Sequence, residues 1–202
     1  MRARWWLAVS LGLVSCTMGR PGADPSPSPP PRDAAVSSPS VVGTSVRVTI
    51  RSAPYRLIAP IQRAVAVWDG PIVYIIGGLD AANTTVGGVY SMNPVSGRLT
   101  AVGSLAQPVH DAAVSLISGR IFVFGGGTGS GTDTVQSFDP RTGRAAVVGH
   151  LPVALSDLAA ARIGATTYIV GGFDGSNPRR EIYATTDGRS FSVVGHLPVG
   201  LR

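Results

Sequence analysis

The seven residues VVGHLPV occur twice in this chain, at residues 147–153 and again at residues 193–199. The two copies lie 46 residues apart. Fixed periods of 20 to 50 residues are typical of solenoids, propellers and related repeat arrays. The chain is therefore expected to consist of successive copies of one supersecondary unit, and this repeat constrains the fold more than any other feature of the sequence.

Other segments recur with nearly the same period. The runs IVYIIGG, RIFVFGG and TTYIVGG end in glycine pairs at residues 77–78, 125–126 and 171–172, which are steps of 48 and 46 residues. Each run is short and rich in β-branched and aromatic residues, which predicts a strand. A first strand precedes each run and two more follow it, so each unit is expected to hold four strands. The predicted units cover about residues 62–107, 108–153 and 154–199.

Four strands in a unit of this length are the layout of a propeller blade. No window of helical length that is free of Gly and Pro keeps an apolar period of 3.6 residues, so we expect an all-β domain. Propellers usually close with four to eight blades. Three units, with one or two further strands at residues 45–60, therefore predict an incomplete or open propeller. Exposed sheet edges invite pairing, so the chain is expected to be the N-terminal portion of a longer propeller or a truncated gene product, or else to associate with another copy that completes the ring.

The letters of these units resemble the Kelch family over residues 62–199. The resemblance rests on an apolar run closed by two glycines, an aromatic residue in the third strand, and a turn such as Asp139-Pro140. The chain departs from the family in lacking its Trp in the last strand, and Thr185 occupies the position of Met92 and Phe138. The resemblance implies divergent Kelch-like blades.

The N-terminus predicts export and lipidation. Arg2 and Arg4 precede an apolar run, which is the plan of a signal peptide at residues 1–15. The run ends in LVSC, which resembles the bacterial lipobox, so Cys16, the only Cys of the chain, is the expected lipidation site. Residues 16–45 are rich in Pro and Ser and predict a semi-rigid tether, which leaves residues 46–202 for the propeller. We expect a protein exported and lipid-anchored to the bacterial cell membrane or outer membrane.

Composition argues against several function classes. All 17 basic residues are Arg, and they are scattered singly except for Arg179 and Arg180, whereas nucleic-acid binding needs a clustered basic face. The loop GGGTGSGT at residues 125–132 lacks the Lys of a phosphate-binding loop. The repeat-equivalent residues His150 and His196 are expected at an outer strand, away from any axial metal site. No cofactor or metal is therefore expected.

The loops between second and third strands should emerge at the same face as the connections between blades. Polar loops on a rigid scaffold are where binding usually resides. Asp111 and Asp157 also lie there, at the start of a first strand, where an Asp either caps a turn or contacts a ligand. The candidate ligand-binding residues on this face are Asp80, Asn83, Asp111, Asp133, Asp157, Asp174, Asn177, Arg179 and Arg180.

These features predict a membrane-anchored Kelch-like binding or interaction module of the cell envelope, with a protein or glycan as ligand. The alternative is an N-terminal fragment of a carbohydrate-active propeller enzyme. The galactose-oxidase type needs a Cys that is already assigned to lipid, and a sugar epimerase would draw on further blades. Residues 185–191 look like a compressed sialidase Asp box, which is a hairpin turn even in that family. No catalytic residues are predicted, and an enzyme is the less favoured hypothesis.

Overall fold

The computed structural model describes residues 48–50, 52, 56–128 and 130–202. The predicted signal peptide, Cys16 and the predicted linker lie outside these residues. Residues Ile50–Arg202 form a compact unit, and the fold described below is that of this unit.

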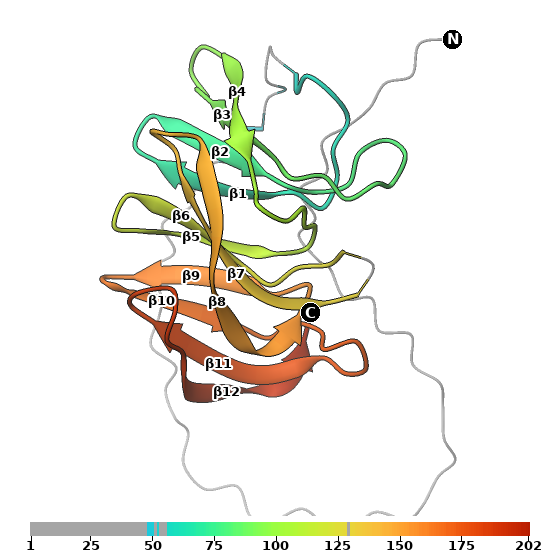
Figure 1. The fold of residues 1–202 in the computed structure, drawn as a ribbon, viewed down its shortest axis with the longest axis vertical. Helices are drawn as coiled ribbons and strands as arrows, with labels where there is room; N and C mark the ends of the chain where they lie inside the picture. Colours follow the sequence, from blue (N-terminus) through green and yellow to red (C-terminus); the bar gives the residue numbers. More distant parts are fainter. Residues whose placement is uncertain (1–47, 51, 53–55, 129) are drawn as a thin grey trace, which may run out of the picture. The chain divides into compact units, whose positions relative to one another are not determined.

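Three antiparallel sheets of four strands follow one another along the chain (Figure 1). Blade 1 consists of β1 (Val65–Asp69), β2 (Ile72–Ile76), β3 (Gly88–Met92) and β4 (Leu99–Ser104). Blade 2 consists of β5 (Ala113–Ile117), β6 (Arg120–Phe124), β7 (Thr132–Asp139) and β8 (Arg144–Leu155). Blade 3 consists of β9 (Ala159–Ile163), β10 (Thr166–Val170), β11 (Arg179–Thr185) and β12 (Ser192–Leu201). In each sheet the spatial order of the strands is their order in the sequence.

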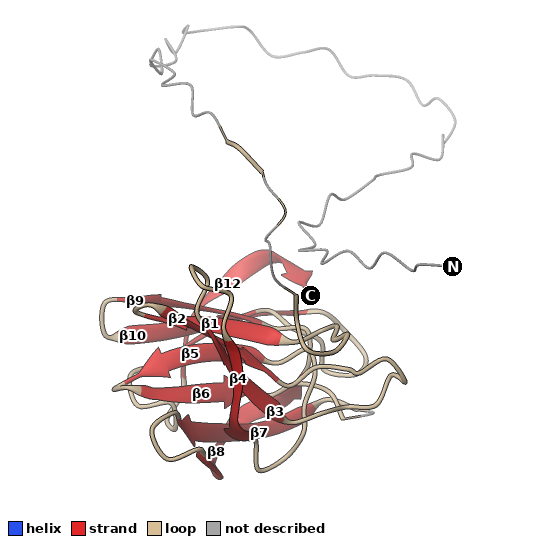
Figure 2. Ribbon diagram, turned by 90° about the horizontal axis from the view of Figure 1, so that it is seen from above, coloured by secondary structure: helices blue, strands red, loops and turns tan. Residues whose placement is uncertain are grey.

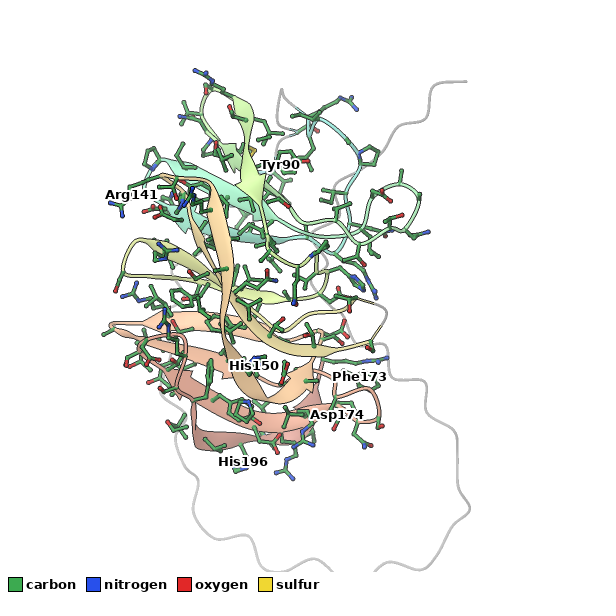
Figure 3. All side chains as sticks on the ribbon, in the orientation of Figure 1. Tyr90, Arg141, His150, Phe173, Asp174 and His196 are labelled. Atoms are coloured by element: carbon green, nitrogen blue, oxygen red, sulfur yellow. The ribbon has the colours of Figure 1, made fainter. Side chains whose placement is uncertain are left out.

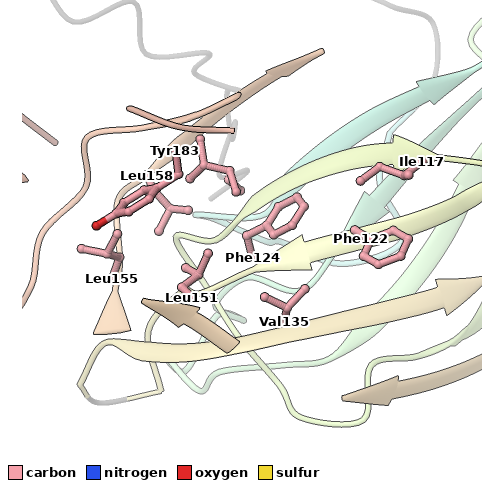
Figure 4. Packing of buried hydrophobic residues seen from close by; sticks show 10 residues of the cluster. Ile117, Phe122, Phe124, Val135, Leu151, Leu155, Leu158 and Tyr183 are labelled. Atoms are coloured by element: carbon pink, nitrogen blue, oxygen red, sulfur yellow. The ribbon is translucent and has the colours of Figure 1, made fainter. Parts of the chain in front are cut away.

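The second strand of blade 2 is apolar from Ile121 to Phe124 because both sides of this middle blade are covered. Successive side chains of a strand point to opposite sides of its sheet. In β6, Ile121 and Val123 belong to the core shared with blade 1, and Phe122 and Phe124 belong to the core shared with blade 3. Figure 4 shows Phe122 and Phe124 among the other buried side chains of the second core. A run of large apolar residues is therefore what this position requires.

The blades pack side by side through these two cores, and their first strands β1, β5 and β9 are neighbours. Residues of blade 1 such as Ile76 and Val89 meet Phe138 of blade 2 in one core. Tyr183 and Ile169 of blade 3 complete the other core. Figure 2 shows only strands and loops in the described part of the chain.

The glycine pairs connect each second strand to the following loop with one repeated geometry. In blade 2, Gly125 has a φ of 58° and Gly126 a φ of 107°. A Cβ at Gly125 would lie 2.5 Å from the Leu155 carbonyl oxygen, so only glycine fits this place without a shift of the backbone. Gly126 N–H donates a hydrogen bond to that same oxygen at 2.8 Å, which ties the end of β8 to the loop.

The prediction of an all-β fold with three four-stranded blades, not closed into a ring, is confirmed. Two details differ. The strand β8 continues to Leu155, beyond residue 153, where the sequence repeat suggested a boundary. The extra strands expected at residues 45–60 are not found at residues 48–50, 52 and 56–60, the part of this segment that the structure describes. A strand needs a neighbouring ladder, and the described pairing near this segment is the single Gln62–Leu79 bridge.

Within the residues that the structure describes, no helix has the length and hydropathy needed to cross a bilayer.

Candidate binding face

Three connections repeat the same pairing at one end of the sheets. A residue shortly before the first strand of each blade forms a β-bridge with the residue that follows the glycine pair. That second residue forms another β-bridge with a residue of the loop before the third strand. These bridges are Gln62–Leu79–Thr85, His110–Gly127–Gly131 and Ser156–Phe173–Pro178. The loops between second and third strands therefore lie at the same end as the connections between blades, as the sequence predicted. We call this end the loop face, and the opposite end, which carries the other hairpin turns, the turn face.

Arg63, Asp111 and Asp157 occupy one repeated position on the loop face, just before the first strand of each blade. Their φ angles are 57°, 51° and 53°, a left-handed conformation that is uncommon for residues other than glycine. Asp111 N–H donates to the Arg63 carbonyl at 3.1 Å, and Asp157 N–H donates to the Asp111 carbonyl at 2.9 Å. The backbone thus fixes the three side chains in a row. With their neighbours His110 and Ser156 they form what we call the inner-strand cluster.

The cluster combines one guanidinium with two carboxylates at a partly buried place. Arg63 Nη1 lies 2.9 Å from Asp111 Oδ2, and the Asp111 side chain is only 14% exposed. Burial, and after it the negative charge of Asp157, raises the pKa of Asp111, while Arg63 and His110 act in the opposite direction. Ser156 Oγ donates a hydrogen bond to Asp157 Oδ2 at 3.0 Å. A carboxyl perturbed by burial and by a like charge marks a candidate functional site.

The other predicted site residues are distributed over separate loops and over the strands β7 and β11. In blade 1, Asp80 Oδ1 accepts hydrogen bonds from the amides of Ala82 and Thr84, both at 2.9 Å. Asn83 Oδ1 accepts a hydrogen bond from Gln62 Nε2 at 2.7 Å. Asp80 thus holds the shape of its own loop, whereas Asn83 ties this loop to the segment before β1. The structure does not bring either residue into the inner-strand cluster.

In blade 3 the predicted residues form a charged network that shapes the β10–β11 loop. Asp174 Oδ1 accepts the amides of Ser176 and Asn177 at 2.9 and 2.8 Å. Arg179 bridges Asp174 Oδ2 at 3.0 Å and Glu181 Oε1 at 2.7 Å. The pKa of Asp174 is lowered, first by the amide hydrogen bond from Asn177. Asp174 lies in the β10–β11 loop, next to Phe173 (Figure 3).

The remaining two predicted residues lie near the outer strands. Arg180 Nε donates to the Leu197 carbonyl at 2.8 Å. Asp133 Oδ1 lies 3.1 Å from His150 Nδ1, and both side chains are exposed. His196 instead faces Glu181 in the β11–β12 ladder, so the two repeat-equivalent histidines have different neighbours. Figure 3 labels both histidines.

The glycine-rich loop of blade 2 directs its amides inward to backbone carbonyls. Gly127 N–H donates to the His110 carbonyl at 2.6 Å, and Thr132 N–H donates to the Gly126 carbonyl at 2.9 Å. These hydrogen bonds give the loop a structural role, in line with the missing Lys. Among the described residues there is no group of three or more His, Cys, Asp or Glu side chains that could hold a metal ion.

Sequence reasoning missed Arg63, His110 and Gln136. Arg63 stands 48 residues before Asp111, the same step as between the first two glycine pairs, and this spacing was the signal that could have found it. His110 is positioned by Thr85, whose Oγ1 lies 2.9 Å from His110 Nδ1. Gln136 is 1% exposed, and its side-chain amide bonds both the amide and the carbonyl of Gln107. Gln136 therefore fastens the connection between blades 1 and 2.

The turn that resembles an Asp box lies on the turn face, between β11 and β12. Asp187 Oδ1 accepts the amides of Arg189 and Ser190, both at 2.8 Å. A Cβ at Gly188 would overlap the Phe122 ring, so the turn rests closely on blade 2. The amide hydrogen bonds from Ser190 and Arg189 lower the pKa of Asp187 to about 2. This turn stabilises the fold, and it lies away from the loop-face carboxylates.

Replacing Asp187 by alanine is expected to lower the free energy of unfolding at pH 7 by about 1 kcal/mol. The carboxylate form is favoured by folding, because its pKa falls from 3.8 to about 2. Its stabilisation is therefore complete above pH 4 and disappears as the pH falls through 2. Urea unfolding of both proteins between pH 2 and 7 measures the difference. A difference that stays constant over this range would contradict the assignment.

Comparison with known proteins identifies the architecture. Residues 108–144, which include β5, β6 and β7, match the family model described as the Kelch motif. A solved structure titled "Structure of YjhT" superposes with a TM-score of 0.60 and 17% sequence identity, over 70% of this chain and 53% of that chain. The fold is that of an open, Kelch-like propeller. The chain spans about half the length of that structure. No curated protein matches the chain.

Proposed function

We propose that this Kelch-like propeller is a membrane-anchored module of the bacterial cell envelope that binds a glycan or protein ligand through its loop face. The inner-strand cluster is the observation that carries the proposal. Its two carboxylates and one guanidinium present donors and acceptors from adjacent blades, and the backbone hydrogen bonds of Asp111 and Asp157 hold them in place. Sites on a preorganised scaffold lose little free energy on ordering when a ligand binds.

The electrostatics of the cluster support this role. Asp111 is poorly solvated and lies near the like charge of Asp157. A hydroxyl or ammonium group of a ligand would donate to these carboxylates and relieve the strain between them. By contrast, Asp80 and Asp174 already accept the hydrogen bonds of their own turns. We therefore place the main ligand contact at Asp111 and Asp157, with the loops as its surroundings.

A glycan array tests the ligand assignment. The full chain with Cys16→Ser, which removes the proposed lipid acceptor, is applied with and without Asp157→Asn. We expect bound glycans to lose about tenfold or more in affinity with Asp157→Asn, the range found when one polar partner of a desolvated site is removed. Asp69→Asn is the matched control, because Asp69 ends β1 on the turn face. Equal binding by all three proteins would contradict the assignment, and an array without any bound glycan would contradict a glycan ligand.

Cys16→Ser is expected to move the protein from the membrane fraction to the soluble fraction. Stable attachment needs more than one acyl chain, and Cys16 is the only thiol of the chain that can carry them. Labelled palmitate incorporation and fractionation of the expressing bacteria measure both effects. Incorporation of label into the Cys16→Ser protein would refute lipidation at this residue.

A further inference from the structure

The repeated heptapeptide has two different environments. In blade 2, Leu151 is 3% exposed, and Val148 and Val153 pack against the core shared with blade 3. In blade 3, the equivalent Val194 is 55% exposed and Val199 is 61% exposed. The side chains of the heptapeptide are thus packed against a neighbouring blade in blade 2 and exposed in blade 3. Blade 3 is what covers them in blade 2, so the uncovered copy marks a place where a further blade fits.

This correspondence extends over the whole side of blade 3. Ile117 of blade 2 is 4% exposed, whereas its equivalent Ile163 is 71% exposed. Leu155 is fully buried, whereas its equivalent Leu201 is 53% exposed. Phe122, Phe124 and Val135 of blade 2 pack against blade 3. The residues at the same repeat positions of blade 3 are also apolar, and they lie on the side of blade 3 that faces away from blade 2. We call these residues the blade 3 side face: Ile163, Tyr168, Val170, Ile182, Val194, Leu197, Val199 and Leu201.

The opposite end of the stack carries the complementary surface. Blade 3 covers blade 2 with Leu158, Ala160, Ile169, Tyr183 and Phe191. The same repeat positions in blade 1 are apolar as well and lie on the side away from blade 2. They form the blade 1 side face: Ala64, Ala66, Ile75, Tyr90 and Leu99, together with Trp68. Trp68 is 72% exposed, an unusual exposure for the largest apolar side chain.

We propose that these two faces bind a second copy of this chain. The blade 3 side face of each copy packs on the blade 1 side face of the other, in the way that blade 2 packs on blade 3 within one chain. Two such junctions related by a twofold axis close a ring, and a head-to-tail contact that closes avoids open polymers. Three blades overlay on 53% of the solved relative's length, so a chain of that length has room for about six blades, within the usual range for a closed propeller.

The segment Leu57–Ile61 of each chain competes for the junction at its own blade 1 side face. It lines an apolar groove on the blade 1 side face together with Ile75, Tyr90 and Leu99. It stands 48 residues before Leu105–Val109, so it occupies the repeat position that the end of a preceding fourth strand would take. In the ring, Leu197–Leu201 of the second copy takes this place, and Leu57–Ile61 must move aside. The inference concerns the side faces alone, so it stands independently of ligand binding at the loop face.

Sedimentation velocity over a range of concentrations tests the proposal. The full chain carries Cys16→Ser throughout, so that lipid does not cause association. We expect twice the mass of one chain, and about tenfold or more weaker association with Ile163→Asp or with Trp68→Asp, as for central interface positions. Both residues are exposed in the single chain, so the variants should fold normally. Val95→Asp is the control, because Val95 is 92% exposed in the β3–β4 turn and belongs to neither side face.

Mixing the two variants gives the sharpest outcome. A pair of Ile163→Asp chains has two damaged junctions, and so has a pair of Trp68→Asp chains. A mixed pair has both changes in one junction and keeps the other junction intact, so the mixture should form dimer at concentrations where each variant alone is monomeric. A Cys16→Ser chain that stays monomeric at every concentration, growth beyond two chains, or a mixture without recovery would overturn the proposal.

The competition step has a separate readout. Leu57→Ser weakens the hold of the segment on the groove and is expected to strengthen dimerisation of the Cys16→Ser chain. Weaker association with Leu57→Ser would show that the segment is part of the junction instead, and would overturn the competition.

Discussion

Replacing Ile117 by alanine is expected to lower the free energy of unfolding by about 2–5 kcal/mol, the range for large apolar residues truncated in a core. Ile117 is 4% exposed and lies between blades 2 and 3. Neighbouring blades cannot close the space without moving whole sheets, so a cavity should remain. Chemical denaturation at concentrations that keep the chain monomeric measures the loss.

Ile163→Ala is the matched control, because Ile163 has the same residue type at the same repeat position. It is 71% exposed in the single chain, so its truncation should change the free energy of unfolding by no more than about 0.5 kcal/mol. Equal losses for the two variants would mean that blade 3 does not cover blade 2 as described.

Gly125→Ala is expected to lower the free energy of unfolding by about 2–5 kcal/mol, from about 1–2 for the left-handed backbone and about 1–3 for the steric overlap. The added Cβ would meet the Leu155 carbonyl at 2.5 Å. That oxygen accepts the hydrogen bond of Gly126, so it cannot move away without breaking the tie at the end of β8.

Gly164→Ala separates the two contributions. Its φ of 61° is close to the 58° of Gly125, but a Cβ at Gly164 would meet nothing within 4 Å. This variant should lose only the conformational part, about 1–2 kcal/mol. A loss as large as that of Gly125→Ala, measured in the same denaturation series, would remove the steric explanation.

The sequence predicted the strands well because local residue types and the repeat both determine them. The second strands lie at Ile72–Ile76, Arg120–Phe124 and Thr166–Val170, directly before the glycine pairs, as the apolar runs indicated. The 46-residue spacing of Asp111 and Asp157 correctly placed them at one repeated position. Strand ends were less predictable, since β8 extends as far as β7 offers it hydrogen-bond partners.

The parts that the sequence did not predict depend on contacts between blades. Arg63 shares the position of Asp111 but has the opposite charge, so a search for repeated residue types overlooks it. The partners of Gln136 are backbone atoms of Gln107, 29 residues earlier in the chain, and no local pattern signals such a pair. The seven other candidate residues were chosen as polar residues of expected loops. Three of them, Asp133, Arg179 and Arg180, lie in β7 and β11 instead, and composition alone could not show that others serve their own turns.

Each loop between a second and a third strand begins and ends at a backbone clamp. At the start of each loop, the N–H of the second glycine donates to a backbone carbonyl at or just beyond the end of the fourth strand of the same blade. These hydrogen bonds join Gly78 to Val109, Gly126 to Leu155 and Gly172 to Leu201. At the end of each loop an amide donates back to the second glycine: Val86 to Gly78, Thr132 to Gly126 and Arg179 to Gly172. Between these clamps the three loops differ in length and composition, while all three sheets keep the same spatial order of four strands. Loop sequences should therefore be exchangeable between blades, or replaced by grafted segments, without reworking the scaffold. In this architecture, the ligand that is recognised can change through the loop sequences while the sheets stay the same.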